Sequence, residues 1–171
     1  MPDSPLALAD GVARPLDPRY VALQRTVGWI VAGVVSSGLA FGLAIAAIAV
    51  WPRLGVLAAA VAAAAVIVAW LVWLAQRWPV LDYARASYVL DERGIEIRRG
   101  VVWRRVINVP RSRVQHTDVS QGPLERSHGL GTLVIYTAGT DHAQVQLPGL
   151  AHETALAIRD HLLPRELADA V

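Results

Sequence analysis

The sequence predicts an α+β protein with a membrane hairpin: two transmembrane helices precede an antiparallel β-barrel or curved sheet, which a C-terminal helix caps. Three observations support this prediction. No charged residue occurs between Arg25 and Arg53, or between Arg53 and Arg77. From Ser87 onward, short runs alternate apolar and polar residues, which is typical of half-buried strands. After Pro148–Gly149 the apolar spacing becomes helical.

Composition narrows the class of protein further. Of the 171 residues 54% are hydrophobic, and all 16 cationic side chains are Arg. The hydrophobic excess is concentrated in the two uncharged stretches, which excludes both a wholly soluble enzyme and a many-span transporter. The absence of Cys excludes disulfides and cysteine-based metal or redox sites. A net charge of +2 is too small to indicate a nucleic-acid partner.

The two uncharged stretches predict transmembrane helices at residues 27–51 and 54–76. The first would be about 37 Å long, against a hydrocarbon core of about 30 Å. Buried core helices are the alternative, but they seldom run this far without a charge. Only a short turn separates the helices, so they form an antiparallel hairpin. Trp residues cluster near the ends of the stretches, as in interfacial belts.

The flanking charges predict the orientation of the hairpin. Several Arg residues precede it and others follow it, whereas the connecting turn holds only Arg53. By the positive-inside rule, both termini of this two-pass protein are expected to be cytoplasmic. A cleaved signal peptide ending near Ala44–Ala46 is the alternative, but its apolar run would be longer than such peptides carry.

Small residues in the first helix include a GxxxG motif at Gly38 and Gly42, which lets two helices approach closely. The motif could form a self-association face. The simpler interpretation is that these glycines pack the hairpin's own two helices, or reflect an Ala-rich composition. Neither helix contains an ionisable residue, so the hairpin is expected to anchor the chain and not to transport.

The remaining sequence predicts a small sheet domain at residues 87–164. Residues 1–26, before the helices, would form an N-terminal juxtamembrane segment, and residues 165–171 a C-terminal tail. Strands are expected at 88–90, 95–98, 101–109, 114–120, 132–137 and 144–147. Residues 138–141 would form a turn, and Pro123 followed by Gly129 brackets one short helical turn. The apolar face of the last helix would comprise Leu150, Leu156, Ile158, Leu162 and Leu163, and Pro164 would end it.

Several segments together resemble the YdbS-like family of small bacterial membrane proteins, which carry a pleckstrin-homology-like (PH-like) domain. The matching segments are Pro15–Tyr20, Arg98–Arg105, Val109–His116, Asp118–Arg126, Gly129–Leu133 and Pro148–Leu150. The resemblance covers nearly the whole chain from Pro15 to Leu163 and includes the two-span hairpin.

The resemblance implies a PH-like domain on the cytoplasmic face of a bacterial inner membrane, and it implies no catalytic residue. No cofactor or metal is expected either. It implies a role in assembly or envelope maintenance, in which a larger multi-span PH-domain protein can be the partner. A homo-oligomer formed through sheet-edge contacts and the face of Gly38 and Gly42 is a further possibility. A lipid-binding role by analogy with eukaryotic modules rests on fold alone.

Six arginines and no acid lie between Arg98 and Thr117, and they are the candidate residues for binding lipid or a partner. They are Arg98, Arg99, Arg104, Arg105, Arg111 and Arg113. Cations near a bilayer are attracted to anionic headgroups, which predicts a surface facing the membrane or a headgroup-binding site. The alternative is ordinary strand surface balanced by neighbouring acids such as Glu96.

Catalytic motifs are not evident. His152–Glu153 begins a zinc-protease pattern, but Leu156 occupies the position of the second ligand. The five His are scattered, and no serine stands in a nucleophile elbow. The sequence therefore favours a non-enzymatic binding or scaffolding module; an anionic-lipid-headgroup binder, or an enzyme of lipid or envelope metabolism, remains the alternative.

Overall fold

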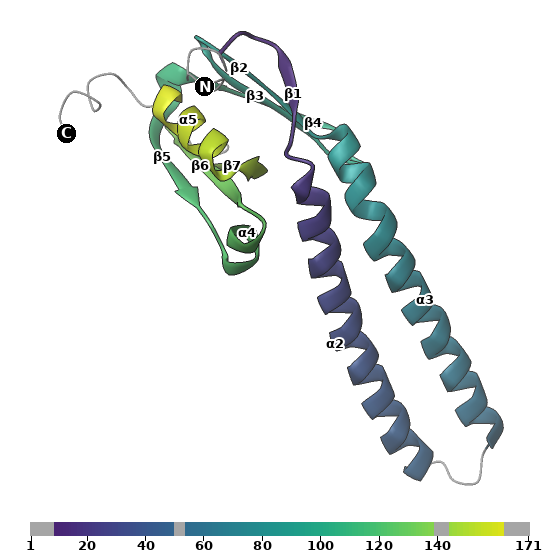
Figure 1. Ribbon diagram of the computed structural model, residues 1–171. Coiled ribbons are helices and arrows are strands. Elements are labelled where there is room, and N and C mark those ends of the chain that lie inside the picture. Colours follow the sequence, from purple (N-terminus) through teal and green to yellow (C-terminus); the bar gives the residue numbers. More distant parts are fainter. Residues whose placement is uncertain (1–8, 50–53, 139–143, 163–171) are drawn as a thin grey trace. The chain divides into compact units, whose positions relative to one another are not determined.

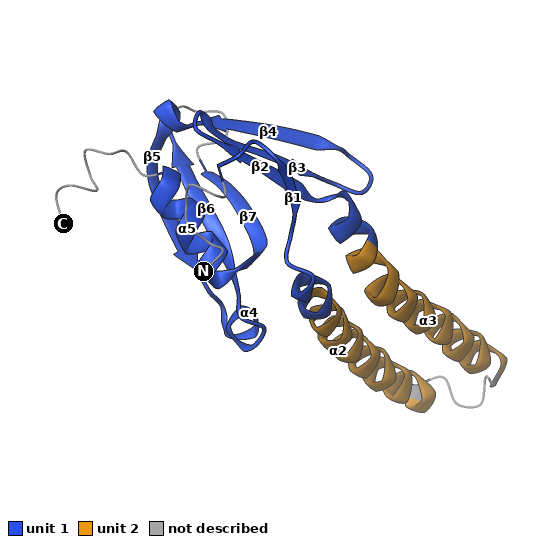
Figure 2. Cartoon of the chain, turned by 45° about the horizontal axis from the view of Figure 1, so that its top comes forward, with its two compact units in different colours: residues 1–23, 81–171 blue, residues 24–80 orange. Residues whose placement is uncertain are grey.

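The computed structural model describes residues 9–49, 54–138 and 144–162, and the chain divides into two compact units (Figures 1 and 2). One unit is the helical part, residues 24–80. The other combines the residues that precede this part with those that follow it, so the hairpin is inserted into the sheet domain in sequence.

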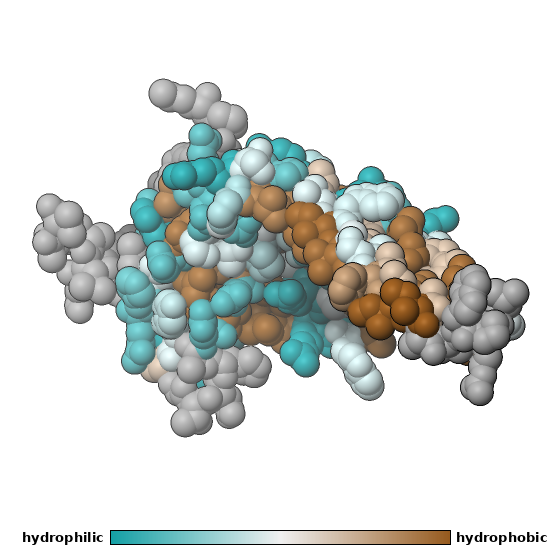
Figure 3. All heavy atoms as spheres, turned by 90° about the horizontal axis from the view of Figure 1, so that it is seen from below, coloured by the Kyte–Doolittle hydropathy of each residue, from teal (hydrophilic) through white to brown (hydrophobic). Residues whose placement is uncertain are grey.

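The helical unit contains most of α2 (Arg19–Ala49) and of α3 (Leu54–Arg85), both longer than the transmembrane segments expected at 27–51 and 54–76. Their apolar side chains face outward, brown in Figure 3. Within the most apolar 18-residue window of each helix, 6% of the residues are buried in α2 and 0% in α3. A core helix of a soluble protein would be buried, so this exposed apolar surface is that of helices surrounded by lipid.

Gly28 marks the close approach between the two helices. A Cβ atom built on it would lie 2.8 Å from the Cβ of Ala75, so the side chain of any other residue would push the helices apart. At Gly38 and Gly42, no described atom lies within 4 Å of such a Cβ. Gly28, another small residue of the first apolar stretch, thus makes the close contact between the two helices that the structure describes.

The first sheet has the strand order β1-β2-β3-β4 and is antiparallel throughout. Its strands are β1 (Ala13–Pro15), β2 (Ser87–Asp91), β3 (Gly94–Arg99) and β4 (Arg105–Pro110). Alternate residues face the core, and Leu90, Ile95 and Ile97 are almost fully buried. This is the period of two that the sequence predicted.

The second sheet has the order β5-β6-β7 and is also antiparallel. Its strands are β5 (Val114–Ser120), β6 (Leu130–Thr137) and β7 (Gln144–Ala151), and the short α4 (Pro123–Ser127) joins the first two. The C-terminal helix α5 (His152–Leu162) packs on this sheet through Ala155, Ile158 and Leu162. The predicted fold class is confirmed; the sheets stay separate and do not close into a barrel.

Two expectations differ from the structure in detail, and a third group is not covered by the described residues. Residues 101–104 form a loop, so the strand expected at 101–109 begins only at Arg105. Leu150 belongs to β7 and not to the last helix, because the strand expected at 144–147 continues to Ala151. Most of the turn expected at 138–141, and Leu163, Pro164 and the tail, lie outside the described residues.

The N-terminal residues belong to the core of the sheet domain, although the sequence suggested only a juxtamembrane segment. Strand β1 pairs with β2, and Leu16, Tyr20 and Leu23 are buried in the same core as the strands. The backbone N–H of Asp17 donates to the carbonyl of Gly149, 2.9 Å away. The domain is therefore built from chain on both sides of the hairpin.

Asp17 stabilises the start of α2. Its carboxylate accepts hydrogen bonds from the backbone N–H of Arg19 at 2.8 Å and from the guanidinium of the same residue. The Arg19 guanidinium, by donating to it, holds the pKa of the Asp17 carboxyl below its ordinary value. The charged form of Asp17 is thus favoured in the folded chain.

Candidate membrane-contact site

The loop between β3 and β4 is a tight turn that depends on one glycine. Arg99 and Arg105 form the last paired position of the β3–β4 hairpin, and residues 100–104 connect them. Gly100 has a φ of 118°, in the region that favours glycine, and a Cβ atom there would overlap the carbonyl oxygen of Trp103. Gly100 therefore permits the chain to turn directly after β3.

This turn exposes large apolar side chains at the end of the β3–β4 hairpin. We refer to residues 101–106 as the β3–β4 tip. Trp103 is 81% exposed, Val102 70% and Val106 63%. Single exposed apolar residues are common, but Val102 and Trp103 on the loop and Val106 at the start of β4 together form an apolar patch. Such a patch marks a surface that contacts another partner or a membrane. Trp in particular favours the interface between lipid and water.

Two of the six candidate arginines belong to the tip and are exposed. Arg104 and Arg105 follow Trp103 directly, and neither forms an ion pair with any residue that the structure describes. The tip therefore combines apolar side chains with uncompensated positive charge. Surfaces of this composition bind at the boundary of an anionic bilayer.

Arg98 and Arg99 lie at the base of the tip and have other interactions. Arg98 is half exposed and pairs with Glu96, with 2.5 Å between Nε and Oε1. It stands opposite Val106 on the neighbouring strand. Arg99 extends to the second sheet, where its Nη1 donates to the carbonyl of Gln146 at 3.3 Å. Arg99 is thus placed to join the two sheets.

A further arginine that the sequence analysis did not select supports the tip. Arg85, the last residue of α3, donates from Nη1 to the carbonyl of Val101 at 3.4 Å. The guanidinium thus provides a hydrogen-bond donor for a carbonyl of the loop. This hydrogen bond connects the tip to the helix end that follows the second apolar segment.

The remaining candidates, Arg111 and Arg113, lie at the opposite end of β4. They form the short helical turn η1 (Arg111–Arg113), next to the position where Pro110 pairs with Gly94. A strand of six residues spans about 17–20 Å, so these arginines are separated from the tip by the length of β4. The basic stretch is continuous in sequence but forms two surfaces in the fold.

The sequence analysis missed the apolar half of the tip. A continuous strand at 101–109 would have turned alternate side chains inward, so Val102 and Trp103 did not stand out. The signal was Gly100 directly before two valines and a Trp, with arginines on both sides. A glycine between charged strand ends indicates a turn, and a turn leaves its side chains exposed.

The titratable residues do not form a metal site in the described part of the chain. No group of three or more His, Asp or Glu residues lies close enough to hold a metal ion there. His116 lies beside Tyr136, with ring centroids 5.8 Å apart, and His161 contacts the backbone carbonyl of Asp91.

Two lipid-facing helices joined to a domain of two antiparallel sheets with a C-terminal helix define a membrane protein that carries a small sheet domain. The chain belongs to the bacterial PH domain family, whose model matches residues 24–166.

A more particular relative is the UPF0699 transmembrane protein YdbS of Bacillus subtilis (strain 168), 45% identical over 76 residues. The match covers 44% of this chain and 45% of that protein, so it spans less than half of the relative's length. The two apolar helices and this relative indicate a two-pass membrane protein. No solved structure matches the chain.

Proposed function

We propose that this chain is a bacterial inner-membrane protein whose PH domain acts as a non-enzymatic binding and scaffolding module in envelope maintenance, with both termini in the cytoplasm. The β3–β4 tip holds the domain against the anionic leaflet. The observation that carries this proposal is the exposed Trp103 beside Arg104 and Arg105. These side chains supply interfacial binding and charge attraction but no nucleophile or acid–base pair.

The expected strength of docking follows from the two exposed arginines and from the helical anchor that tethers the domain. Each Arg near an anionic leaflet contributes about 1 kcal/mol of attraction, so Arg104 and Arg105 together contribute about 2 kcal/mol. Because the helical anchor already keeps the domain at the bilayer, this energy acts on an intramolecular equilibrium. Loss of both charges should lower the docked-to-undocked ratio roughly thirtyfold.

The absence of Cys from the chain provides a direct test. Val102→Cys, labelled with an environment-sensitive dye in the full chain in vesicles, should report an apolar environment when the vesicles contain anionic lipid. Ser112→Cys, exposed in η1 at the far end of β4, is the matched control. Adding Arg104→Gln and Arg105→Gln should return the Val102→Cys label to a polar environment. Equal signals at both labels in all lipids would refute the proposed docking.

A scaffolding role needs a surface for a partner, and β4 offers one. It is an edge strand of the first sheet, with one side unpaired within the described sheet. A cavity of about 150 Å³ lies beside it, bounded by Ile107, Thr137 and Val145. An added strand from a second copy, or from a larger PH-domain membrane protein, would satisfy the free backbone groups. Crosslinking in native membranes should then yield a dimer or a larger complex; recovery of the monomer alone would contradict this partner surface.

A further inference from the structure

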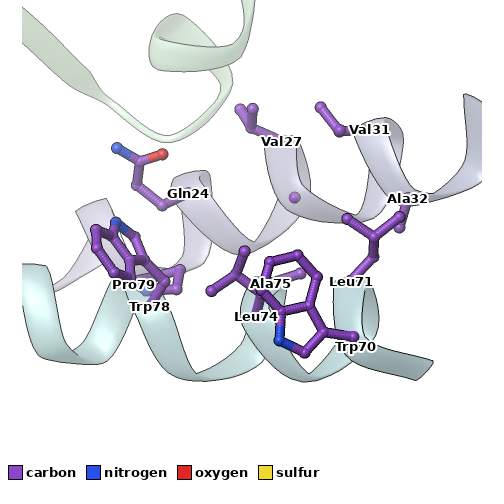
Figure 4. Close-up of a pocket in the computed structure, with 11 residues that line it drawn as sticks. Gln24, Val27, Val31, Ala32, Trp70, Leu71, Leu74, Ala75, Trp78 and Pro79 are labelled. Atoms are coloured by element: carbon purple, nitrogen blue, oxygen red, sulfur yellow. The ribbon is translucent and has the colours of Figure 1, made fainter. Parts of the chain in front are cut away.

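The helical unit contains an apolar groove between the N-terminal half of α2 and the C-terminal half of α3. Facing stripes of α2 and α3 line it, and its volume is about 460 Å³ (Figure 4). The stripes meet at Gly28 and Ala75, and beyond this contact Val31 and Leu71 line opposite sides. Small-ligand sites commonly occupy about 300–1,000 Å³, so the groove is large enough for an elongated molecule.

The groove has a polar end and an apolar end. Gln24 is the only amide among the described residues that line it, and it lies at the same end as Trp78 and Pro79. Trp70 and Leu71 lie toward the other end, with Val31 opposite (Figure 4). An occupant with one polar terminus and a long apolar body would match this gradient.

Positive charge is placed at the polar end. The helices are antiparallel, so Arg25, which follows Gln24, and Arg77, which precedes Trp78, belong to the same end of the hairpin. Both are exposed, and neither forms an ion pair with a described residue. Guanidinium groups bind phosphate through two parallel hydrogen bonds, and Trp favours the headgroup zone.

From these features we infer that the groove binds one acyl chain of an anionic phospholipid, whose headgroup phosphate lies between Arg25 and Arg77. In a bilayer, lipid chains are the medium that surrounds the groove, and no hydrophobic effect drives an apolar peptide into it. An unfilled groove would forfeit dispersion contacts along its walls. A single flexible chain can fill a narrow groove more completely than a rigid helix of about 10 Å diameter.

The inference is tested by lipid retention on the full chain. The protein is extracted from vesicles of mixed phosphatidylglycerol and phosphatidylcholine, washed in lipid-free detergent and measured by native mass spectrometry. We expect one phosphatidylglycerol to remain bound per chain. Leu71→Trp should abolish retention by filling the groove, and Val27→Phe provides a second filling variant. Val66→Trp, which adds the same ring at an exposed position of α3 that does not line the groove, should retain lipid.

The charged end is tested separately. Arg25→Gln with Arg77→Gln should remove the preference for phosphatidylglycerol over phosphatidylcholine. Equal retention in the wild type, Leu71→Trp and Val66→Trp would overturn the inference, because the bound lipid would then be annular. A dimer without bound lipid that Leu71→Trp dissociates would also overturn it, since a second copy would occupy the groove. Arg104→Gln should leave retention unchanged, so this site and the β3–β4 tip can fail independently.

Discussion

Replacement of Tyr20 by Ala should detach the start of α2 from the sheet domain. Tyr20 is 4% exposed and packs in the core with Leu16 and Leu23. Its ring lies directly over Gly149, where an added Cβ would come within 2.6 Å of two ring carbons. A buried aromatic ring removes about 150–250 Å² from water, and its truncation to Ala costs about 3–5 kcal/mol.

This loss is a large fraction of the total stability of about 5–15 kcal/mol that is usual for a domain. We expect hydrogen exchange in the full chain in detergent to become much faster in β1 and β7, while α3 stays protected. Tyr136→Ala is the matched control, because Tyr136 is 37% exposed and its ring contact with His116 adds only about 0.5–1.5 kcal/mol beyond the area it buries. If the two variants exchange alike, the N-terminal residues do not contribute to the domain core, and the reasoning is refuted.

Three further predictions concern the same framework. Gly149→Ala should destabilise the domain by about 1–3 kcal/mol through overlap with Tyr20 and a φ of 80°, measured as a lower thermal midpoint in detergent; an unchanged midpoint would contradict the packing described. The lowered pKa of Asp17 means that its carboxylate contributes stability above the unfolded value of about 3.9, and that this contribution is lost as pH falls through the folded pKa. Unfolding midpoints between neutral pH and pH of about 3 should therefore fall more steeply in the wild type than in Asp17→Asn, whereas parallel curves would exclude the contribution. Gly28→Val should lower the resistance of the hairpin to unfolding by SDS, by about 1–3 kcal/mol, whereas Gly38→Val should not, and equal effects would count against the Gly28–Ala75 contact.

Local patterns predicted most of the elements. The uncharged stretches indicated two membrane helices, because a charge inside a bilayer is costly and its absence over such a length is informative. Alternation indicated β2 and β3, whose inward residues are buried as expected. It also indicated β5, but a register shift between Val114 and His116 interrupts the alternation there, and the buried residues are Val114 and Thr117. The family resemblance agrees with the bacterial PH domain match.

Other features depended on contacts between distant parts of the chain. Nothing in the sequence around Leu16 and Tyr20 shows that they pack against β7, because this contact joins segments on opposite sides of the hairpin. The bounds of β7 followed from its pairing with β6, which extends to Ala151. A helical period starting at Leu150 could not reveal this pairing.

The candidate site also combines features that local sequence predicted with features that depend on contacts between distant residues. The sequence by itself determined that the chain has two lipid-facing helices, a sheet domain and a stretch rich in Arg, because hydropathy and alternation are properties of neighbouring residues. Only the tertiary structure decided that this stretch forms two surfaces, separated by the length of β4, with Trp103 exposed at one of them. The reason is physical: which side chains share a surface depends on strand pairing and on the turn at Gly100, and both are completed only when the sheet forms.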